Sequence, residues 1–195
     1  KYQFGEVIGS GGFGEIFEGK RVEDGWVCAI KKLFVSADEE DKKRFHREVR
    51  MQAQLRHKNV VPIIGYNLED DPPWFVMSRA LFNLKEYLTN RKGESEIWII
   101  YEIAAGISHA HENGVIHRDI KPSNVILDDS GNACLTDFGL ARVIEGHSSL
   151  TGSMLMGTPA YVSPEQGRGE QLDARSDQYS LGVILYEMAT GRLPF

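Results

Sequence analysis

The sequence has no long hydrophobic run: it contains no stretch of about 18 consecutive apolar residues, the length a helix needs to cross a bilayer. It also lacks the basic stretch and following apolar run of a secretory signal. Only two cysteines occur, Cys28 and Cys134, and two thiols cannot by themselves build a disulfide framework or a zinc site. We therefore expect a reduced, cytoplasmic protein with no membrane contact within this segment.

Positively charged residues are fewer than negatively charged ones. The chain carries 22 lysine and arginine residues against 28 aspartate and glutamate residues, a net charge of −6. Proteins whose main partner is nucleic acid usually carry a basic excess, so we expect no nucleic-acid partner. With 42% hydrophobic and 26% charged residues, the composition excludes collagen-like, low-complexity and disordered chains.

The periodicity of apolar residues changes near residue 80, from strand-like to mainly helical. The pattern predicts strands at 2–8, 15–18, 26–33, 60–66, 74–78, 125–127 and 133–136, and helices at 38–56, from 97 to a stop at Gly114, and at 174–190. The stretch 138–172 is predicted to be loop. We expect an α+β fold with a boundary at residue 80.

The first chemical signal is a glycine-rich loop, Gly9-x-Gly11-x-x-Gly14. Glycines between strands let backbone N–H groups approach phosphate oxygens without a side-chain clash. A strand, a turn and another strand follow, whereas a dinucleotide-binding fingerprint would need a helix there. Taken alone, the loop could equally be a tight hairpin that binds nothing.

A second signal joins a strand to a helix. Lys31 alternates with Ile30 along its strand, and Glu48 lies on or near the apolar helix face that carries Phe45 and Val49. A carboxylate in such a place needs a cation, which predicts a Lys31–Glu48 pair. The alternative is that Lys31 is a solvated surface lysine, as most lysines are.

The third signal is a cluster of oxygen-bearing side chains, Asp119, Asn124 and Asp137, with Lys121 two residues after the first. Carboxylate and amide oxygens suit a hard ion such as Mg²⁺ that is shared with phosphates. Each aspartate taken singly fits an ordinary turn. Together they predict one polar cleft.

In this order, the motifs resemble the signature set of the eukaryotic-type (Hanks-type) serine/threonine protein kinases. They are Gly9-x-Gly11-x-x-Gly14-x-Ile16, Ala29-Ile30-Lys31, His117-Arg118-Asp119 with Asn124, and Asp137-Phe138-Gly139. Ser163-Pro164-Glu165 stands where the family usually has Ala-Pro-Glu. Lys121 and residues 157–161 are similar to the serine/threonine branch, and residues 158–166 to its bacterial members.

The resemblance implies a two-lobed fold, with an ATP-binding lobe at 1–80 and a catalytic, mainly helical lobe at 81–195. It implies transfer of the γ-phosphate of ATP, with Mg²⁺, to serine and threonine hydroxyls of protein substrates in signalling, and self-association for autophosphorylation. The chain starts without Met and stops before the family's last helices. We expect a piece of a longer protein, which could carry a membrane anchor elsewhere.

The same resemblance assigns roles to single residues. Asp119 would orient the substrate hydroxyl and accept its proton, Lys121 would steady the γ-phosphate, and Asn124 and Asp137 would hold Mg²⁺. The glycine loop would cover the phosphates, Lys31 would contact the α- and β-phosphates, and apolar side chains would enclose the adenine. The full nucleotide-binding set is Ile8, Gly9, Ser10, Gly11, Gly12, Phe13, Gly14, Ile16, Ala29, Lys31, Glu48, Met77, Ser78, Ala80 and Ile126.

One departure from the family concerns Gln52, which stands one turn after Glu48 where the family usually packs an apolar residue. Because no expected catalytic residue is missing, an active kinase is favoured over a pseudokinase that binds nucleotide without catalysis. A third alternative is a segment that folds poorly by itself. The loop at 140–156 carries several hydroxyls, and its phosphorylation, at Thr151 first and Ser149 second, is expected to dock it on Arg118 and Arg142.

Overall fold

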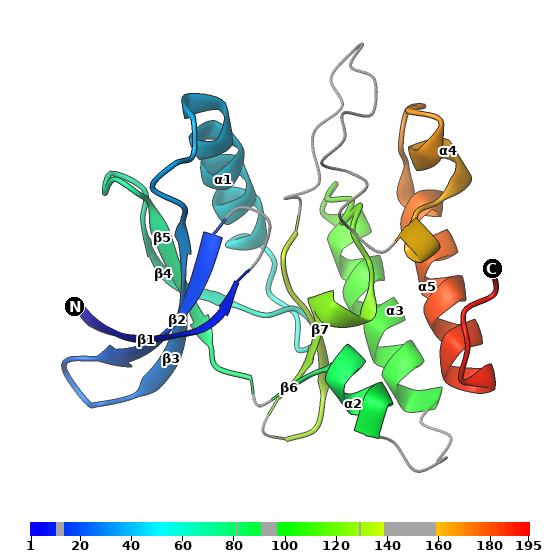
Figure 1. Cartoon of the computed structure of the whole chain (residues 1–195), viewed down its shortest axis with the longest axis horizontal. Coiled ribbons are helices and arrows are strands. Elements are labelled where there is room, and N and C mark those ends of the chain that lie inside the picture. The colour runs from blue at the N-terminus through cyan, green and yellow to red at the C-terminus, as the bar shows by residue number, and fades with distance from the viewer. Residues whose placement is uncertain (11–13, 81, 91–96, 129, 139–158) are drawn as a thin grey trace.

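Five antiparallel strands form one sheet in the first part of the chain, in the order β1-β2-β3-β5-β4 (Figure 1). The computed structural model describes residues 1–10, 14–80, 82–90, 97–128, 130–138 and 159–195. The strands are β1 (Tyr2–Ser10), β2 (Gly14–Arg21), β3 (Val27–Leu33), β4 (Ile63–Asn67) and β5 (Trp74–Ser78), and the helix between β3 and β4 is α1 (Glu39–Gln52).

Strand β3 supplies apolar side chains to both faces of the sheet, because successive side chains of a strand point to opposite sides. Ala29 and Leu33 belong to a buried cluster with Phe45 and Val49 of α1. Ile30 belongs to a separate cluster on the other face. The alternation predicted for this strand is therefore confirmed, and it directs Lys31 to the α1 side.

Helix α1 begins as expected and ends earlier than predicted. The Asp38 side chain caps it by accepting a hydrogen bond from the N–H of Asp41 at 2.8 Å. The prediction of a helix to residue 56 is wrong, since α1 ends at Gln52. The N–H groups of Gln54 and Leu55 bind carbonyls three residues back, which tightens the chain into a turn.

The next strand starts later than predicted, at Ile63 rather than at residue 60. The residues before it pair with a different part of the chain. The N–H of Val61 donates to the carbonyl of Leu135 at 2.8 Å, and the N–H of Leu135 donates to the carbonyl of Asn59 at 2.9 Å. These two hydrogen bonds join the segment after α1 to the second part of the fold.

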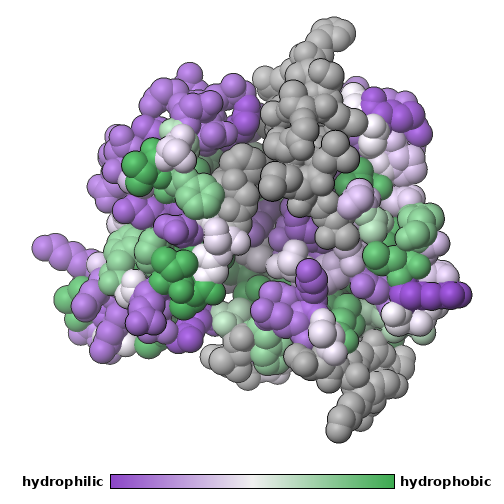
Figure 2. Space-filling model, in the orientation of Figure 1, coloured by the Kyte–Doolittle hydropathy of each residue, from purple (hydrophilic) through white to green (hydrophobic). Residues whose placement is uncertain are grey.

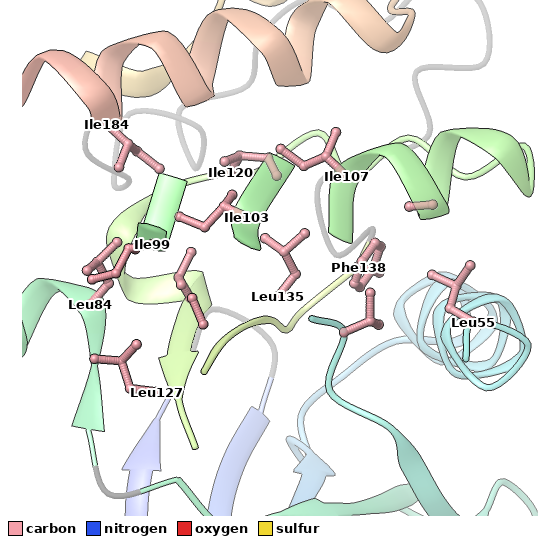
Figure 3. Close-up of a cluster of buried hydrophobic side chains, with 14 of the residues drawn as sticks. Leu55, Leu84, Ile99, Ile103, Ile107, Ile120, Leu127, Leu135, Phe138 and Ile184 are labelled. Carbon is pink, nitrogen blue, oxygen red and sulfur yellow. The ribbon is translucent and has the colours of Figure 1, made fainter. Parts of the chain in front are cut away.

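The second part is mainly helical, with one small sheet of order β6-β7-β8. Its strands are β6 (Phe82–Asn83), β7 (Val125–Leu127) and β8 (Ala133–Leu135), and its helices are α2 (Leu84–Asn90), α3 (Ile97–Glu112), α4 (Pro164–Gly167) and α5 (Ala174–Thr190), with single 3₁₀ turns η1 (Pro122–Asn124) and η3 (Pro159–Tyr161). Figure 3 shows Ile99, Ile103 and Ile107 of α3 directed at the buried cluster that also contains Leu135 and Ile184.

A glycine brings α3 against the segment after α1. A Cβ at Gly106 would lie 2.6 Å from the carbonyl oxygen of Asn59, closer than any side chain allows. The carboxamide of Asn59 in turn donates to the carbonyl of Ala133 at 2.9 Å, in β8. The segment at Asn59 therefore contacts both helix α3 and strand β8 and holds them together.

The predicted loop at 138–172 is wrong in part. Residues 139–158 lie outside the described residues, but η3 and α4 form within the rest. Ser163 starts α4 through a capping box, in which it and Gln166 bind each other's backbone N–H groups. Helix α5 matches its prediction and ends at Gly191, whose φ of 73° suits a glycine.

The surface above α1 is mostly hydrophilic in the space-filling view, in keeping with the many charged residues of that helix (Figure 2). In the part of the chain that the structure describes, every helix is too short or too polar to span a membrane.

Candidate active site

Asp119 is the carboxylate among the predicted catalytic residues, and two neighbouring side chains donate hydrogen bonds to it. It follows α3 in a loop that leads to η1, and its side chain is 37% exposed. Lys121 Nζ donates to Asp119 Oδ2 at 2.7 Å, and Asn124 Nδ2 donates to the same oxygen at 2.9 Å. Asn124 Nδ2 also reaches the Asp119 carbonyl at 2.9 Å. The three residues therefore form one hydrogen-bonded unit around a partly open carboxylate.

The turn before Asp119 is held from α5. Asp177, which is 1% exposed, accepts hydrogen bonds from the N–H groups of His117 at 2.9 Å and Arg118 at 2.8 Å. It also lies 2.7 Å from Nε2 of His111. Burial opposes its ionisation, but the bond from His111 and the backbone donors hold the pKa of Asp177 below its ordinary value.

The hydrogen bonds that Asp177 accepts hold a strained backbone conformation at Arg118. Arg118 has a φ of 69°, in the left-handed region that non-glycine residues rarely adopt. The carboxamide of Gln166 in α4 donates to the Arg118 carbonyl at 2.7 Å, so both backbone polar groups of Arg118 have a side-chain partner. Neither His111 nor Gln166 carried a sequence signal that distinguished it from an ordinary helix residue.

Lys31 does not form the predicted pair with Glu48. Its ammonium lies 2.7 Å from Asp137 Oδ1, and no hydrogen-bond partner for either carboxylate oxygen of Glu48 exists among the described residues. Asp137 follows β8 with a φ of 62°, and this conformation accompanies the approach of its carboxylate to β3. Asp137 thus takes the position at Lys31 that was expected for Glu48, which corrects the sequence prediction.

The charges of Lys31, Asp137 and Glu48 influence one another. Burial works against the charge on Lys31, but the carboxylates of Asp137 and Glu48 outweigh it and hold the pKa of Lys31 above its ordinary value. Burial likewise opposes ionisation of Asp137, while the charge and hydrogen bond of Lys31 lower its pKa overall. Burial raises the pKa of Glu48 to about 8, despite the nearby charge of Lys31.

Asn124 and Asp137 are brought near each other by the backbone. The N–H of Thr136 donates to the Asn124 carbonyl at 3.0 Å, which places η1 beside the residue that precedes Asp137. The ring of Phe138 packs on that of His117 with centroids 4.6 Å apart, which anchors Asp137 from its other side. The charge of Lys121 also acts on Asp137, and the charge of Asp119 acts on Lys31, so all these groups share one site.

The donor set at this point fits magnesium. Asp137 offers a carboxylate and Asn124 an amide oxygen, and Mg²⁺ usually takes one or two such ligands together with waters and phosphates. Within the described ranges, no three histidine, cysteine, aspartate or glutamate side chains converge as a complete metal cage. The arrangement suits an ion that arrives with a phosphate ligand.

The residues predicted to enclose an adenine lie in one cluster. Ala29 and Met77 face each other across β3 and β5, and Ile16 of β2 and Ile126 of β7 pack against the same cluster. Ser78 ends β5 and Ala80 follows it. This cluster brings together strands from both sheets.

The structure describes only the ends of the glycine loop. Ile8, Gly9 and Ser10 complete β1, with Ile8 45% exposed, and Gly14 begins β2. Gly11, Gly12 and Phe13 lie outside the described residues. A Cβ at Gly14 would lie 2.2 Å from the carbonyl oxygen of Lys32, so this glycine is required by strand packing itself.

The chain belongs to the protein kinase domain family, whose profile matches residues 2–195. An antiparallel sheet with one helix followed by a mainly helical part is the two-lobed arrangement of that family, as expected from the sequence.

Curated relatives agree with this assignment. The whole chain is similar to the serine/threonine-protein kinases PrkC of Bacillus subtilis (36% identity over 201 residues, 31% of that protein) and pkn3 of Myxococcus xanthus (34% over 210 residues, 38% of that protein). It is also similar throughout to the DNA damage-responsive serine/threonine-protein kinase RqkA of Deinococcus radiodurans (36% over 206 residues, 30% of that protein). The chain spans about a third of the length of these relatives.

Proposed function

We propose that the protein is an active serine/threonine kinase that transfers the γ-phosphate of ATP to hydroxyl groups of protein substrates in signalling. The observation that carries this proposal is the Asp119 carboxylate, which Lys121 and Asn124 hold beside the Lys31–Asp137 pair. The names of the relatives support the same activity. Phosphoryl transfer needs positioning and charge neutralisation more than covalent help, and these residues supply both.

Asp119 acts on the substrate hydroxyl. Its partly exposed carboxylate accepts a hydrogen bond from that hydroxyl and aims the oxygen at the γ-phosphorus. It takes up the proton as the new oxygen–phosphorus bond forms, while the bond from the γ-phosphorus to the bridging oxygen breaks and ADP leaves. Lys121 lies 2.7 Å from Asp119, so its ammonium can stay with the phosphoryl group as the group reaches the hydroxyl. Asn124 keeps the carboxylate in place through its two hydrogen bonds.

Lys31, Asn124 and Asp137 act on the phosphates of ATP. Lys31 offers a buried cation to the α- and β-phosphates, and Asn124 and Asp137 would hold Mg²⁺ through their side-chain oxygens. The ion would supply charge neutralisation on the phosphates of ATP. The glycine loop covers the phosphates.

The adenine is enclosed by apolar side chains from the two parts of the fold. Ile16, Ala29 and Ile126 contact its faces, Met77 closes the back, and backbone groups at 78–80 bind its edge. This assignment divides the protein at residue 80, with a nucleotide-binding lobe at 1–80 and a catalytic lobe at 81–195.

Regulation by phosphorylation of the loop at 140–156 belongs to the same proposal, with Thr151 first and Ser149 second. Both lie outside the described residues. The buried Nε of Arg118 has no hydrogen-bond partner in the described ranges. A phosphate group on the loop would supply an acceptor for it. The proposal includes a second copy of the protein as the phosphorylating partner and a cytoplasmic location. Mass spectrometry of the active protein, with Thr151→Ala and Ser149→Ala kinetics, tests it, and full activity of the double variant contradicts it.

The direct test of the activity uses the full-length protein with labelled ATP, Mg²⁺ and a basic protein substrate. We expect label on serine and threonine, in an amount that depends on magnesium. Asp137→Asn should weaken binding of Mg²⁺ with ATP and reduce transfer together. Nucleotide binding without any transfer by the wild-type protein would instead identify a pseudokinase.

A further inference from the structure

An ion pair joins strand β2 to the connection that follows β5. Arg79 Nη1 donates to Glu18 Oε2 at 2.5 Å, although the two residues are 61 positions apart in the sequence. Each side chain is 44% exposed. Arg79 stands between Ser78, which ends β5, and Ala80, and this connection leads to β6 in the second sheet. The ion pair therefore ties the first sheet to the connection between the two sheets.

Glu18 lies on the sheet face that carries the cluster assigned to the adenine. It pairs with Ala29 of β3, and Ala29 pairs with Met77 of β5, so these three residues form one row across the sheet. Directly opposed residues of antiparallel strands direct their side chains to the same face. Ala29 and Met77 belong to the buried cluster that also includes Ile16, two residues before Glu18 on β2. Glu18 is therefore the partly exposed end of a row whose other members enclose the adenine in the proposed function.

Strand β1 leaves room beside this side chain. The register between β1 and β2 shifts at Glu18, where two residues of β1 oppose this single residue of β2. One of the two is Gly5, and a Cβ at Gly5 would lie 3.1 Å from the carbonyl oxygen of Glu18 and 3.6 Å from its Cβ. Bulges of this kind re-aim side chains and occur often next to active sites. The backbone at this point therefore gives the Glu18 side chain space on its β1 side.

The pair is too exposed to matter much for the stability of the fold. Exposed ion pairs contribute little to the free energy of unfolding, because water screens them and two long side chains lose freedom. The position of this pair gives it a different consequence. The adenine has to fit between the row on the first sheet and Ile126 of the second sheet. Movement of β2 away from the connection at 78–80 would widen that space, and the ion pair opposes the movement. A site that is already held in its binding shape takes up a ligand at a lower cost in free energy.

We propose that Glu18 and Arg79 are positioning residues for the nucleotide, which hold β2 against the connection after β5 and so keep the adenine site at its binding width. The inference rests on the proposed kinase function and adds two residues that act on nucleotide affinity through the backbone around the adenine. Neither residue belongs to the groups assigned to the phosphates or to the substrate hydroxyl. The pair therefore acts on binding of the nucleotide and leaves the transfer step unchanged.

The test is a double-mutant cycle between Glu18 and Arg79 in the full-length protein. We expect Glu18→Ala and Arg79→Ala each to weaken binding of a non-hydrolysable ATP analogue with Mg²⁺ by about two- to fivefold, the range of an exposed ion pair. The double variant should bind no more weakly than either single variant. The KM for ATP should rise by the same factor, while kcat and the KM for the protein substrate stay unchanged. A general loss of packing would not produce this split.

Exchange of the two charges, Glu18→Arg with Arg79→Glu, should recover most of the lost affinity. Salt at about 1 M should shrink the difference between wild type and the single variants, because the pair is exposed to solvent. Arg21→Gln is the matched control: it breaks a similarly exposed ion pair, with Asp24, at the far end of β2 and should leave binding unchanged.

Unchanged analogue binding by both single variants, or losses that simply add in the double variant, would overturn the inference. Either result leaves the proposed function standing as long as the wild-type protein binds the analogue. A wild-type protein that binds no nucleotide would refute the proposed function together with the inference.

Discussion

Glu48 makes the stability of the protein depend on pH. Its side chain is 2% exposed, and burial raises its pKa from 4.5 to about 8, although the charge of Lys31 acts to lower it. Between these two values the folded protein binds a proton that the unfolded chain has released. The stability that this proton contributes is complete below about pH 4.5 and is lost as the pH rises to about 8.

The size of the effect follows from the pKa difference. Each pKa unit corresponds to about 1.4 kcal/mol, so the penalty is roughly 3 kcal/mol at pH 7 and approaches about 5 kcal/mol above pH 8. Glutamine has a similar shape and never ionises, so Glu48→Gln removes the penalty. Allowing for the lost attraction to Lys31, the variant should gain about 1–3 kcal/mol in free energy of unfolding at pH 7.

The assay is thermal unfolding of wild type and Glu48→Gln between pH 5 and pH 8. We expect the midpoint of Glu48→Gln to lie above that of wild type by a gap that widens with pH to several degrees. Glu6→Gln, at an exposed position of β1, is the matched control and should show no widening. A gap that stays constant over this range would refute the reasoning, because it would mean that Glu48 is ionised in the folded protein throughout.

Three further predictions concern other parts of the site and its support. Asp177→Ala leaves the N–H groups of His117 and Arg118 without their acceptor and should cost about 2–5 kcal/mol by denaturant unfolding; a loss below about 0.5 kcal/mol would contradict it. Gly106→Ala should lower the melting temperature because the new Cβ meets Asn59, whereas Gly182→Ala, with open space around it in α5, should leave it equal or higher. Lys31→Met removes the partner of Asp137 and should weaken ATP binding and lower stability by about 1–3 kcal/mol; unchanged values of both in titration calorimetry and melting would disprove the pair.

Long periodic elements were predictable because many residues agree on one structure. Helices α3 and α5 have apolar residues at three- and four-residue steps and a glycine just beyond their ends, so their bounds were close to those predicted. Helix α4 has only four residues and depends on one capping box, which a periodicity search does not detect. The end of α1 was missed because the apolar pattern continues to Leu55, whereas the N–H groups of Gln54 and Leu55 already form turn hydrogen bonds to carbonyls three residues back.

The residues of the candidate site were likewise predicted in part and missed in part. The order of the motifs pointed to Asp119, Asn124 and Asp137, and the structure places them together through contacts between η1 and the end of β8. The partner of Lys31 could not be deduced from spacing, because the charges of Glu48 and Asp137 both act on Lys31 and only the folded chain shows that Asp137 forms the ion pair. His111 binds the Asp177 carboxylate and Gln166 binds the Arg118 carbonyl, and no local pattern reveals such contacts across the fold.

The most direct test of the central claim, that Asp119 carries out the transfer step, is a comparison of phosphoryl transfer and ATP affinity in Asp119→Asn. Asparagine keeps the size of the side chain but cannot accept the hydroxyl proton as a carboxylate does. We expect transfer to fall by about 10²-fold or more while the Kd for ATP with Mg²⁺ changes little, because other residues hold the nucleotide. Asp173→Asn, which keeps a good capping residue at the start of α5, is the matched control and should retain full transfer. Transfer by Asp119→Asn at the wild-type rate would contradict the account.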